Sequence, residues 1–388
     1  MISSIKISNF KSIIDATAKL PHFGAIVGLN AAGKSNLIIS IELTKLLIAG
    51  NVDLSILADR YVSVPEELFN LRDNSPTRPF SFEFEISAES DAKYLFGISI
   101  ALKKNPNTAS TLVVDQEYLK KVSNGSDVLI YKRNSDGSIQ TNGEVIPPTI
   151  NISNDKLFIP LYETPDTDKV KQVFRNIRLQ SSDVKNLRSP GVFLNGNEVS
   201  RSDRISNLVG RVMKDTNLYG QFLKIIKTLM PNFSDFKEIK IDTEKIKGNE
   251  FMILMQENSL QRELSSRSFS EGDLRTFAII ATALEAPSGS AFFIEEVENG
   301  MHPGRAEKLV EYLDTFSKVK DIQIVFSTHS PLVINELKPH NILFVSKNGH
   351  GTEFELLSDS EDITRIKALL KEGGSVSDYL STKLSKRG

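Results

Sequence analysis

The chain has 388 residues, of which 40% are hydrophobic and 25% charged, and it contains no cysteine. This length and composition are ordinary for a globular protein of two or three structural units with a large core. A formal net charge of −2 excludes a global field that would draw the whole molecule onto nucleic acid or an anionic membrane, and the lack of cysteine excludes disulfides and thiolate metal sites.

The first fifty residues predict two strands and a helix around a glycine-rich loop. Residues 2–8 alternate as a strand does, and residues 23–27 form a short apolar run that is typical of a strand buried on both faces. Apolar residues then recur at helical spacing from Leu37 until Gly50. The loop at 28–35 therefore lies where a strand turns into a helix.

The middle of the chain predicts a twisted antiparallel sheet followed by helices. Residues 80–146 hold short alternating runs, separated by turn signals at 124–125, 136–137 and 142–143. Residues 166–230 have a helical pattern, interrupted around 189–197.

The last third of the chain predicts strands, helices and a hairpin. The predicted strands are 239–241, 250–255, 291–294 and 324–328, the helices are 272–284 and 304–316, and the hairpin joins 341–345 to 353–357. We expect the last eight residues to be a frayed tail.

The strongest chemical signal is Gly28-Leu29-Asn30-Ala31-Ala32-Gly33-Lys34-Ser35. A polyphosphate needs several backbone N–H groups at a helix N-terminus with no side chain in the way, and the two glycines allow that approach. Lys34 brings a cation to the β and γ phosphates, and Ser35 offers a hydroxyl to Mg²⁺. With the next residue, Asn36, this segment is the predicted ATP-binding loop; the alternative is an ordinary glycine turn between a strand and a helix.

Two carboxylates follow the apolar strand 291–294. Glu295 can hold Mg²⁺ directly or through water, although Asp is commoner at this position, and Glu296 can act as the general base toward an attacking water. Taken alone, the two acids could equally begin a solvated loop together with Glu298. The phosphate loop upstream favours the catalytic interpretation.

Two more segments gain meaning from those before them. His329 ends an apolar strand, and a neutral imidazole there can hydrogen-bond the γ phosphate or the attacking water, although a buried structural histidine is the better interpretation in isolation. Ser270-Glu271-Gly272 opens a helix, and small residues there leave its N-terminus open to an anion, although a plain helix cap is the simpler interpretation. His302 has no comparable phosphate role, and we interpret it as structural, with a place at a subunit contact left open.

In this order the segments resemble the ABC-type ATPase heads of the RecF, SMC and OLD proteins. Residues 28–35 resemble the Walker A motif, 270–272 the signature motif, 291–296 the Walker B motif and 329 the switch histidine, and the opening Ile5-Lys6-Ile7-Ser8-Asn9-Phe10-Lys11-Ser12 resembles the start of that group. The chain is most similar to stand-alone bacterial AAA family ATPases, with a Ser-Glu-Gly-x-x-Arg signature that ends here at Arg275. Their Glu-Glu-Pro-Glu-Asn-Gly-x-His-Pro motif is residues 295–303 here, with Val297 in place of the first proline.

The resemblance implies an α/β fold, a P-loop NTPase of the ABC-ATPase head type. It would combine a mixed or antiparallel sheet lobe, a parallel-sheet RecA-like core and a helical insert. The expected segments are 1–100 and 246–388 for the two parts of the head and 101–245 for the insert. A Q-loop glutamine is also implied, and the sequence does not locate it; Gln116 is one option.

The resemblance further implies a two-fold homodimer, with higher oligomers left open. Each of two ATP molecules, with Mg²⁺ on Ser35 and Glu295, would lie between the Walker A loop of one subunit and the signature residues Ser270 and Gly272 of the other. Hydrolysis by Glu296 and His329 would then loosen the dimer.

Three functions remain open at this point. The first is a sensor or regulator in an anti-phage module that works with a separately encoded effector, such as a nuclease. The second is a RecF-like DNA-repair ATPase that binds DNA, and the third is a non-catalytic, ATP-gated interaction protein. No apolar run reaches the ~18 residues of a membrane span and no signal-peptide pattern opens the chain, so we expect a cytoplasmic protein without a membrane partner.

Overall fold

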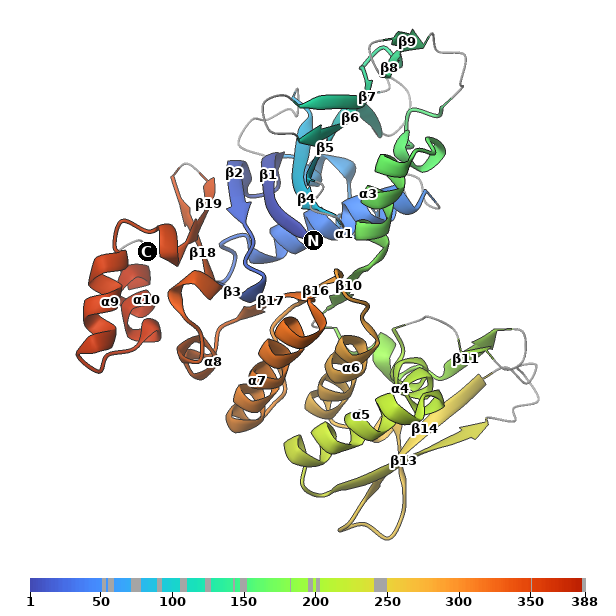
Figure 1. Cartoon of the computed structure of the whole chain (residues 1–388), viewed down its shortest axis with the longest axis vertical. Helices are drawn as coiled ribbons and strands as arrows, with labels where there is room; N and C mark the ends of the chain where they lie inside the picture. The colour runs from blue at the N-terminus through green and yellow to red at the C-terminus, as the bar shows by residue number, and fades with distance from the viewer. Residues whose placement is uncertain are drawn as a thin grey trace. The chain divides into compact units, whose positions relative to one another are not determined.

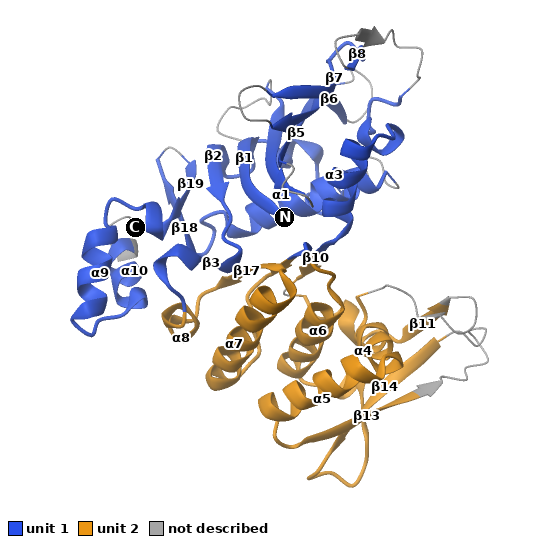
Figure 2. Ribbon diagram, in the orientation of Figure 1, with its two compact units in different colours: residues 1–177, 289–291, 337–388 blue, residues 178–288, 292–336 orange. Residues whose placement is uncertain are grey.

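The protein is described by a computed structural model of the whole chain, residues 1–388 (Figure 1). The described residues are 1–50, 54, 59–70, 78–88, 93–104, 110–122, 127–141, 144–146, 152–181, 183–194, 198–199, 203–240, 250–349 and 351–385. They form two compact units (Figure 2), of which unit 1 comprises 1–177, 289–291 and 337–388, and unit 2 comprises 178–288 and 292–336. The segments expected from the sequence, 1–100, 101–245 and 246–388, follow the positions of the motifs rather than these units, and they stay a prediction.

The described residues of unit 1 contain an antiparallel sheet, a short parallel pair and four helices longer than one turn. Its strands are β1 (Ile2–Phe10), β2 (Ile13–Lys19), β3 (Phe23–Gly28), β4 (Phe80–Ser87), β5 (Lys93–Lys103), β6 (Thr111–Val122), β7 (Val128–Arg133), β8 (Ile139–Thr141), β9 (Glu144–Ile146), β18 (Ile342–Asn348) and β19 (Gly351–Leu356). Its helices are α1 (Lys34–Ala49), α3 (Pro165–Arg175), α9 (Ile363–Lys371) and α10 (Val376–Ser385), with single 3-10 turns at Pro65–Leu68, Ile159–Leu161, Pro339–Asn341 and Leu357–Asp359.

The antiparallel sheet has the strand order β2-β1-β4-β5-β6-β7-β8-β9. Strict alternation in β4 sends Phe80, Phe82, Phe84 and Ile86 into the core, where each is fully buried. Phe174 of α3 packs edge-on against Phe84, with ring centroids 5.3 Å apart, so this helix covers the apolar face. The predicted sheet over 80–146 is confirmed, and β1 and β2 extend it.

The strand before the glycine loop belongs to a second run of strands in unit 1. β18 pairs in parallel with residues 25–28 of β3 and antiparallel with β19. All six residues of β3 are buried. This full burial matches the uninterrupted apolar sequence of β3. The predicted strands at 2–8 and 23–27, the helix after the loop and the hairpin over 341–357 are confirmed.

Unit 2 contains the remaining strands and helices. Its strands are β10 (Ile177–Gln180), β11 (Gly191–Leu194), β12 (Glu198–Val199), β13 (Phe233–Lys240), β14 (Glu250–Glu257), β15 (Leu264–Ser265), β16 (Ala291–Ile294) and β17 (Gln323–Thr328). Its helices are α4 (Ile205–Lys214), α5 (Thr216–Leu229), α6 (Glu271–Glu285), α7 (Pro303–Lys320) and α8 (Pro331–Asn335), with 3-10 turns at Asn186–Arg188 and Ser266–Ser268. The first residues of β10 and β16 are counted with unit 1.

An aromatic cluster holds α6 against the β13–β14 hairpin of unit 2. Phe277 of α6 packs against Phe236 at 4.8 Å and Phe269 at 5.7 Å between ring centroids, and both contacts are edge-on. The face of α6 that carries Phe277 is buried, as are β16 and β17 along their whole length. The start of α6 and the ends of β16 and β17 are thereby fixed within one body.

Several predictions need correction or lie outside the described residues. The helical pattern predicted for 166–230 is wrong at β10 and β12, whereas β11 lies within the predicted interruption around 189–197. β11 pairs with β12 and with β14, which is distant in the sequence. The frayed tail is wrong for 381–385, which belong to α10, where Lys383 is buried and 2.7 Å from Glu355. Residues 124–125, 142–143, 195–197, 241 and 386–388 lie outside the described residues.

None of the described helices combines the length and apolar character needed to cross a membrane.

Candidate nucleotide site

The predicted site residues are divided between the two units. Residues 28–36 lie in unit 1, whereas 270–272, 295–296 and 329 lie in unit 2. Each group is described within its own unit.

The glycine loop of unit 1 joins the end of β3 to the start of α1 and has an unusual backbone. Gly33 has a φ of 118° and Ala31 a φ of 59°, so two of the six residues before Lys34 adopt left-handed conformations. A Cβ on Gly28 would lie 2.2 Å from the carbonyl oxygen of Val345, so the first glycine is required by strand packing as well. Ala31 is small, as expected from the sequence, but an alanine in this region costs about 1–2 kcal/mol of backbone strain. Such strain is typical of functional loops.

Lys34 lies over this loop as the sequence pattern requires. Its ammonium group donates to the carbonyl oxygens of Gly28 and Leu29, both at 2.9 Å, and only 8% of the residue is exposed. Around it, Leu29, Asn30, Ala31 and Ser35 are exposed. The loop therefore presents exposed backbone and a serine hydroxyl above a buried cation, which is the arrangement that an anionic ligand needs.

A network of side chains braces the second half of the loop. The amide of Asn36 donates to Ser12 Oγ at 2.8 Å, Ser12 Oγ and Thr352 Oγ1 are 2.8 Å apart, and Thr352 Oγ1 donates to the carbonyl oxygen of Ala32 at 2.8 Å. Asn36, expected to contact the nucleotide, thus has a partner within the protein. Ser12 carries a signal in the opening motif, whereas nothing in the sequence marks Thr352, which is more than 300 residues away.

In unit 2, the two carboxylates follow β16 directly and are partly exposed. The amide of Glu295 donates to the carbonyl oxygen of Gln180 at 2.9 Å, at the end of β10. Glu296 has a φ of 46°, its amide donates to Ser327 Oγ at 2.8 Å, and its carboxylate accepts from the Asn299 side chain at 3.3 Å. A strained backbone fixed by specific hydrogen bonds is expected for a side chain that must point in a set direction.

The loop after Glu296 also anchors the histidine segment. Glu298 Oε1 accepts from the amides of His329 at 2.7 Å and Ser330 at 3.1 Å, so Glu298 is not merely a solvated acid. His329 itself is exposed at the end of β17. Val297, which replaces the family's proline, donates its amide to the carbonyl oxygen of Ser327 at 3.1 Å, a bond that proline could not make.

The signature segment begins α6 as a conventional cap. Ser270 Oγ accepts from the amide of Asp273 at 3.1 Å. A Cβ on Gly272 would lie 2.1 Å from the carbonyl oxygen of Gly300, so this glycine allows α6 to approach the loop that follows Glu296. His302 caps α7 by accepting from Gly304 at 3.3 Å, which confirms its structural role.

Arg275 is a functional candidate that the sequence reasoning did not assign. It is 1% exposed, and its guanidinium donates to the carbonyl oxygens of Ser181 at 2.9 Å, Glu296 at 2.8 Å and Glu295. Burial lowers the pKa of Arg275, and the carboxylates nearby, first Glu296, oppose that shift. The arginine of the signature motif is the only sequence signal for this contact.

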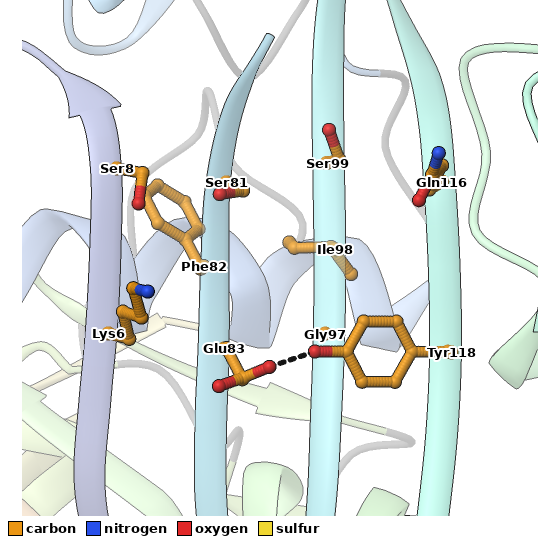
Figure 3. A pocket seen from close by; sticks show the side chains of 10 residues that line it. All are labelled: Lys6, Ser8, Ser81, Phe82, Glu83, Gly97, Ile98, Ser99, Gln116 and Tyr118. Carbon is orange, nitrogen blue, oxygen red and sulfur yellow. Dashed lines mark hydrogen bonds between the residues drawn. The ribbon is translucent and has the colours of Figure 1, made fainter. Parts of the chain in front are cut away.

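Gln116, considered for the Q-loop, lies elsewhere. It lines a shallow polar hollow of about 290 Å³ on the sheet of unit 1, in which Tyr118 donates to Glu83 (Figure 3). This hollow contains none of the predicted site residues. In unit 2, the backbone of Gln180 lies next to that of Glu295, while the buried Gln180 side chain donates to the carbonyl oxygen of Ser181 at 3.4 Å.

The described residues contain no group of three or more histidines and carboxylates arranged to hold a metal ion. Ser35 in unit 1 and Glu295 in unit 2 are the residues predicted from the sequence to bind Mg²⁺, and this assignment stays a prediction.

Comparison with known proteins places the chain in a family. A family model described as "AAA domain, putative AbiEii toxin, Type IV TA system" matches residues 23–335. The chain is also 24% identical over 380 residues to the "Old nuclease" of Escherichia phage P2, and the match covers 90% of this chain and 60% of that protein. The chain thus spans less than two thirds of the length of this relative.

Solved structures of SMC heads share the fold. The SMC head bound to the C-winged helix domain of ScpA has a TM-score of 0.55 and 14% identity, with 91% of this chain and 97% of that chain covered. The SMC head domain with an extended coiled coil, bound to the C-terminal domain of ScpA and derived from Pyrococcus furiosus, has a TM-score of 0.51 and 14% identity, with 96% and 98% covered. The predicted fold class, an ABC-ATPase head, is confirmed.

Proposed function

The chain belongs to the family of AAA domains whose model matches residues 23–335, within the ABC-type, SMC- and OLD-like ATPases, and from this premise we propose that it binds ATP with Mg²⁺ and hydrolyses it. The observation that carries the proposal is the structure of the glycine loop. Gly33 has a left-handed backbone, and the buried ammonium group of Lys34 donates to the carbonyl oxygens of Gly28 and Leu29. A ligand with several phosphate oxygens would replace those carbonyl groups as the partner of Lys34.

The residues of the two units would divide the chemistry. In unit 1, residues 28–36 bind the phosphates and Ser35 contributes a hydroxyl to Mg²⁺. In unit 2, Glu295 contributes to the same ion, Glu296 accepts the proton of the attacking water, and His329 hydrogen-bonds the γ phosphate. When bound, Mg²⁺ would offset the charge that develops on the phosphate oxygens. We assign the Q-loop role to Gln180, because it lies beside Glu295.

We propose that the working form is a two-fold dimer. Ser270 and Gly272 would contact the ATP bound to the partner subunit, so that each nucleotide is enclosed by two chains. Ser270 and Glu271 are exposed at the start of α6, and a helix N-terminus attracts anions, which supports this proposal.

Three variants test hydrolysis and dimerisation together. Lys34→Ala should abolish ATP binding, and Glu296→Gln should bind ATP, lose at least 100-fold in turnover and accumulate as a dimer, because a positioned base contributes ~10²–10⁴-fold. Glu311→Gln, an exposed glutamate of α7, is the matched control and should behave as the wild type. The measurements are phosphate release and light scattering after size exclusion. A Glu296→Gln protein that hydrolyses ATP at the wild-type rate, or stays monomeric at saturating ATP, would refute the catalytic or the dimeric part respectively.

The biological role that we propose is that of a sensor or regulator working with a separate effector, a nuclease, in anti-phage defence. The names of the matching family and of the phage relative, a toxin of a type IV TA system and a nuclease, support this role. A nuclease gene beside this one, together with phage sensitivity on its deletion, would support the proposal. Replication or repair genes beside it, with ATP-dependent binding of duplex DNA that weakens as salt rises, would favour the RecF-like alternative.

A further inference from the structure

The signature helix and the catalytic loop of unit 2 are joined by a buried arginine. Arg275 lies in the second turn of α6, a few residues after Ser270. Its guanidinium reaches three backbone carbonyl groups, those of Glu295, Glu296 and Ser181. The last of these follows Gln180, so one side chain fixes both the end of β16 and the end of β10.

Two further contacts join the same elements. Gly272 meets the carbonyl group of Gly300 so closely that no side chain fits between them. Asp273 forms an ion pair of 2.7 Å with Arg305 of α7, and both side chains are mostly buried. The first turns of α6 therefore cannot move without moving the loop that carries Glu296.

Glu298 extends this connection to the histidine. One oxygen of its carboxylate holds the amides of His329 and Ser330. Its other oxygen, Oε2, and Nε of Arg275 are both buried and lack a hydrogen-bond partner within the described residues, although the two charges attract each other.

We propose that Arg275 and Glu298 are positioning residues that transmit movement of the signature segment to Glu296 and His329 of the same subunit. This rests on the proposed function, in which Ser270 and Gly272 face the nucleotide of the partner. Contact with the partner's ATP would then set the orientation of the base in this subunit, so that the two hydrolysis sites of a dimer are coupled.

The test compares three conservative variants in the full chain. Arg275→Lys keeps the charge but loses the planar fork that serves three carbonyl groups, and Glu298→Gln keeps one acceptor but removes the charge. Arg211→Lys is the matched control, because Arg211 forms an ion pair of 2.8 Å with Glu285 at the opposite end of α6. We expect kcat to fall at least tenfold in the first two variants and to stay within twofold of the wild type in the control. The affinity for ATP should change by less than threefold in all three, since the loop of unit 1 is untouched.

A double-mutant cycle separates positioning from general damage. In single-turnover measurements, adding Arg275→Lys to Glu296→Gln should cause little further loss, because the group that Arg275 positions is already absent. Multiplicative losses would overturn the proposal. If the melting curve shows that Arg275→Lys does not fold, the test depends on Glu298→Gln. A kcat of Glu298→Gln within twofold of the wild type would then overturn the proposal. If the wild type does not hydrolyse ATP, both the proposed function and this inference are wrong. If the wild type hydrolyses ATP and the Arg275→Lys and Glu298→Gln variants have the same kcat, only this inference is wrong.

Discussion

The glycine loop allows a quantitative prediction for Gly33→Ala. A Cβ at this position would lie 2.7 Å from both Cγ2 and Oγ1 of Thr352 and 3.1 Å from Ser12 Oγ. The left-handed backbone costs an alanine about 1–2 kcal/mol, of which roughly 0.4–1 kcal/mol is offset by the stiffer unfolded chain. Overpacking adds about 1–3 kcal/mol.

The net cost is about 3 kcal/mol, and it falls on the loop conformation that binds phosphate. Because each 1.4 kcal/mol is a factor of ten, we expect the dissociation constant for ATP to rise roughly 100-fold. The assay is titration calorimetry with ATP and Mg²⁺, together with thermal unfolding of the same samples.

Gly137→Ala is the control, because Gly137 also has a positive φ, 82°, but nothing lies within 4 Å of its Cβ position. It should lose about 1 kcal/mol of stability or less and keep its affinity for ATP. Thr352→Ser removes Cγ2 while keeping the hydroxyl that donates to Ala32, and it should restore part of the affinity of Gly33→Ala. If Gly33→Ala binds ATP within threefold of the wild type, the steric reasoning is refuted.

Three further predictions concern stability, pH and metal. Gly220 is exposed within α5, and nothing lies within 4 Å of the position that a Cβ would take. Gly220→Ala should therefore stabilise the folded protein by about 0.5–1 kcal/mol and raise its melting temperature by roughly 1–3 °C. A lower melting temperature would contradict this. Burial raises the pKa of Glu117 above 4.5, against hydrogen bonds from Phe158, Tyr131 and Ile159. The native state therefore binds the proton of Glu117 more tightly than the unfolded state does. The stability of the wild type relative to Glu117→Gln should be greatest below pH 4.5 and should decline as the pH rises through the raised pKa. If the melting temperatures of the two proteins change in parallel from pH 4 to 8, this prediction is wrong. Glu295→Gln should raise the Mg²⁺ concentration for half-maximal ATP hydrolysis at least tenfold, and an unchanged Mg²⁺ titration would remove Glu295 from the metal site.

The sequence predicted those parts of the fold that depend on local pattern. Strict alternation in β4 and the apolar run of β3 each determine burial directly, and both strands were located correctly. β11 was not predicted as a strand. It pairs with β12, which follows it closely, and with β14, about sixty residues away in the sequence. A pattern of nearby residues contains no information about a partner as distant as β14.

The candidate site divides in the same way. The motifs identify Gly33, Lys34 and Glu296, since their chemistry depends on residue type and spacing. The support around them could not be predicted, because Thr352 reaches the loop only through the fold and Arg275 acts on backbone carbonyl groups, which every residue has. Supporting contacts of this kind leave almost no trace in a single sequence.

The cap at the start of α6 determines what that helix end can recognise. The oxygen of Ser270 accepts a hydrogen bond from the amide of Asp273, which leaves it one lone pair fewer to offer, while its O–H can still donate. Together with the N–H groups that begin the helix, this end of α6 offers more donors than acceptors. It therefore favours a ligand that accepts hydrogen bonds, such as an oxyanion, over an ammonium group, which only donates.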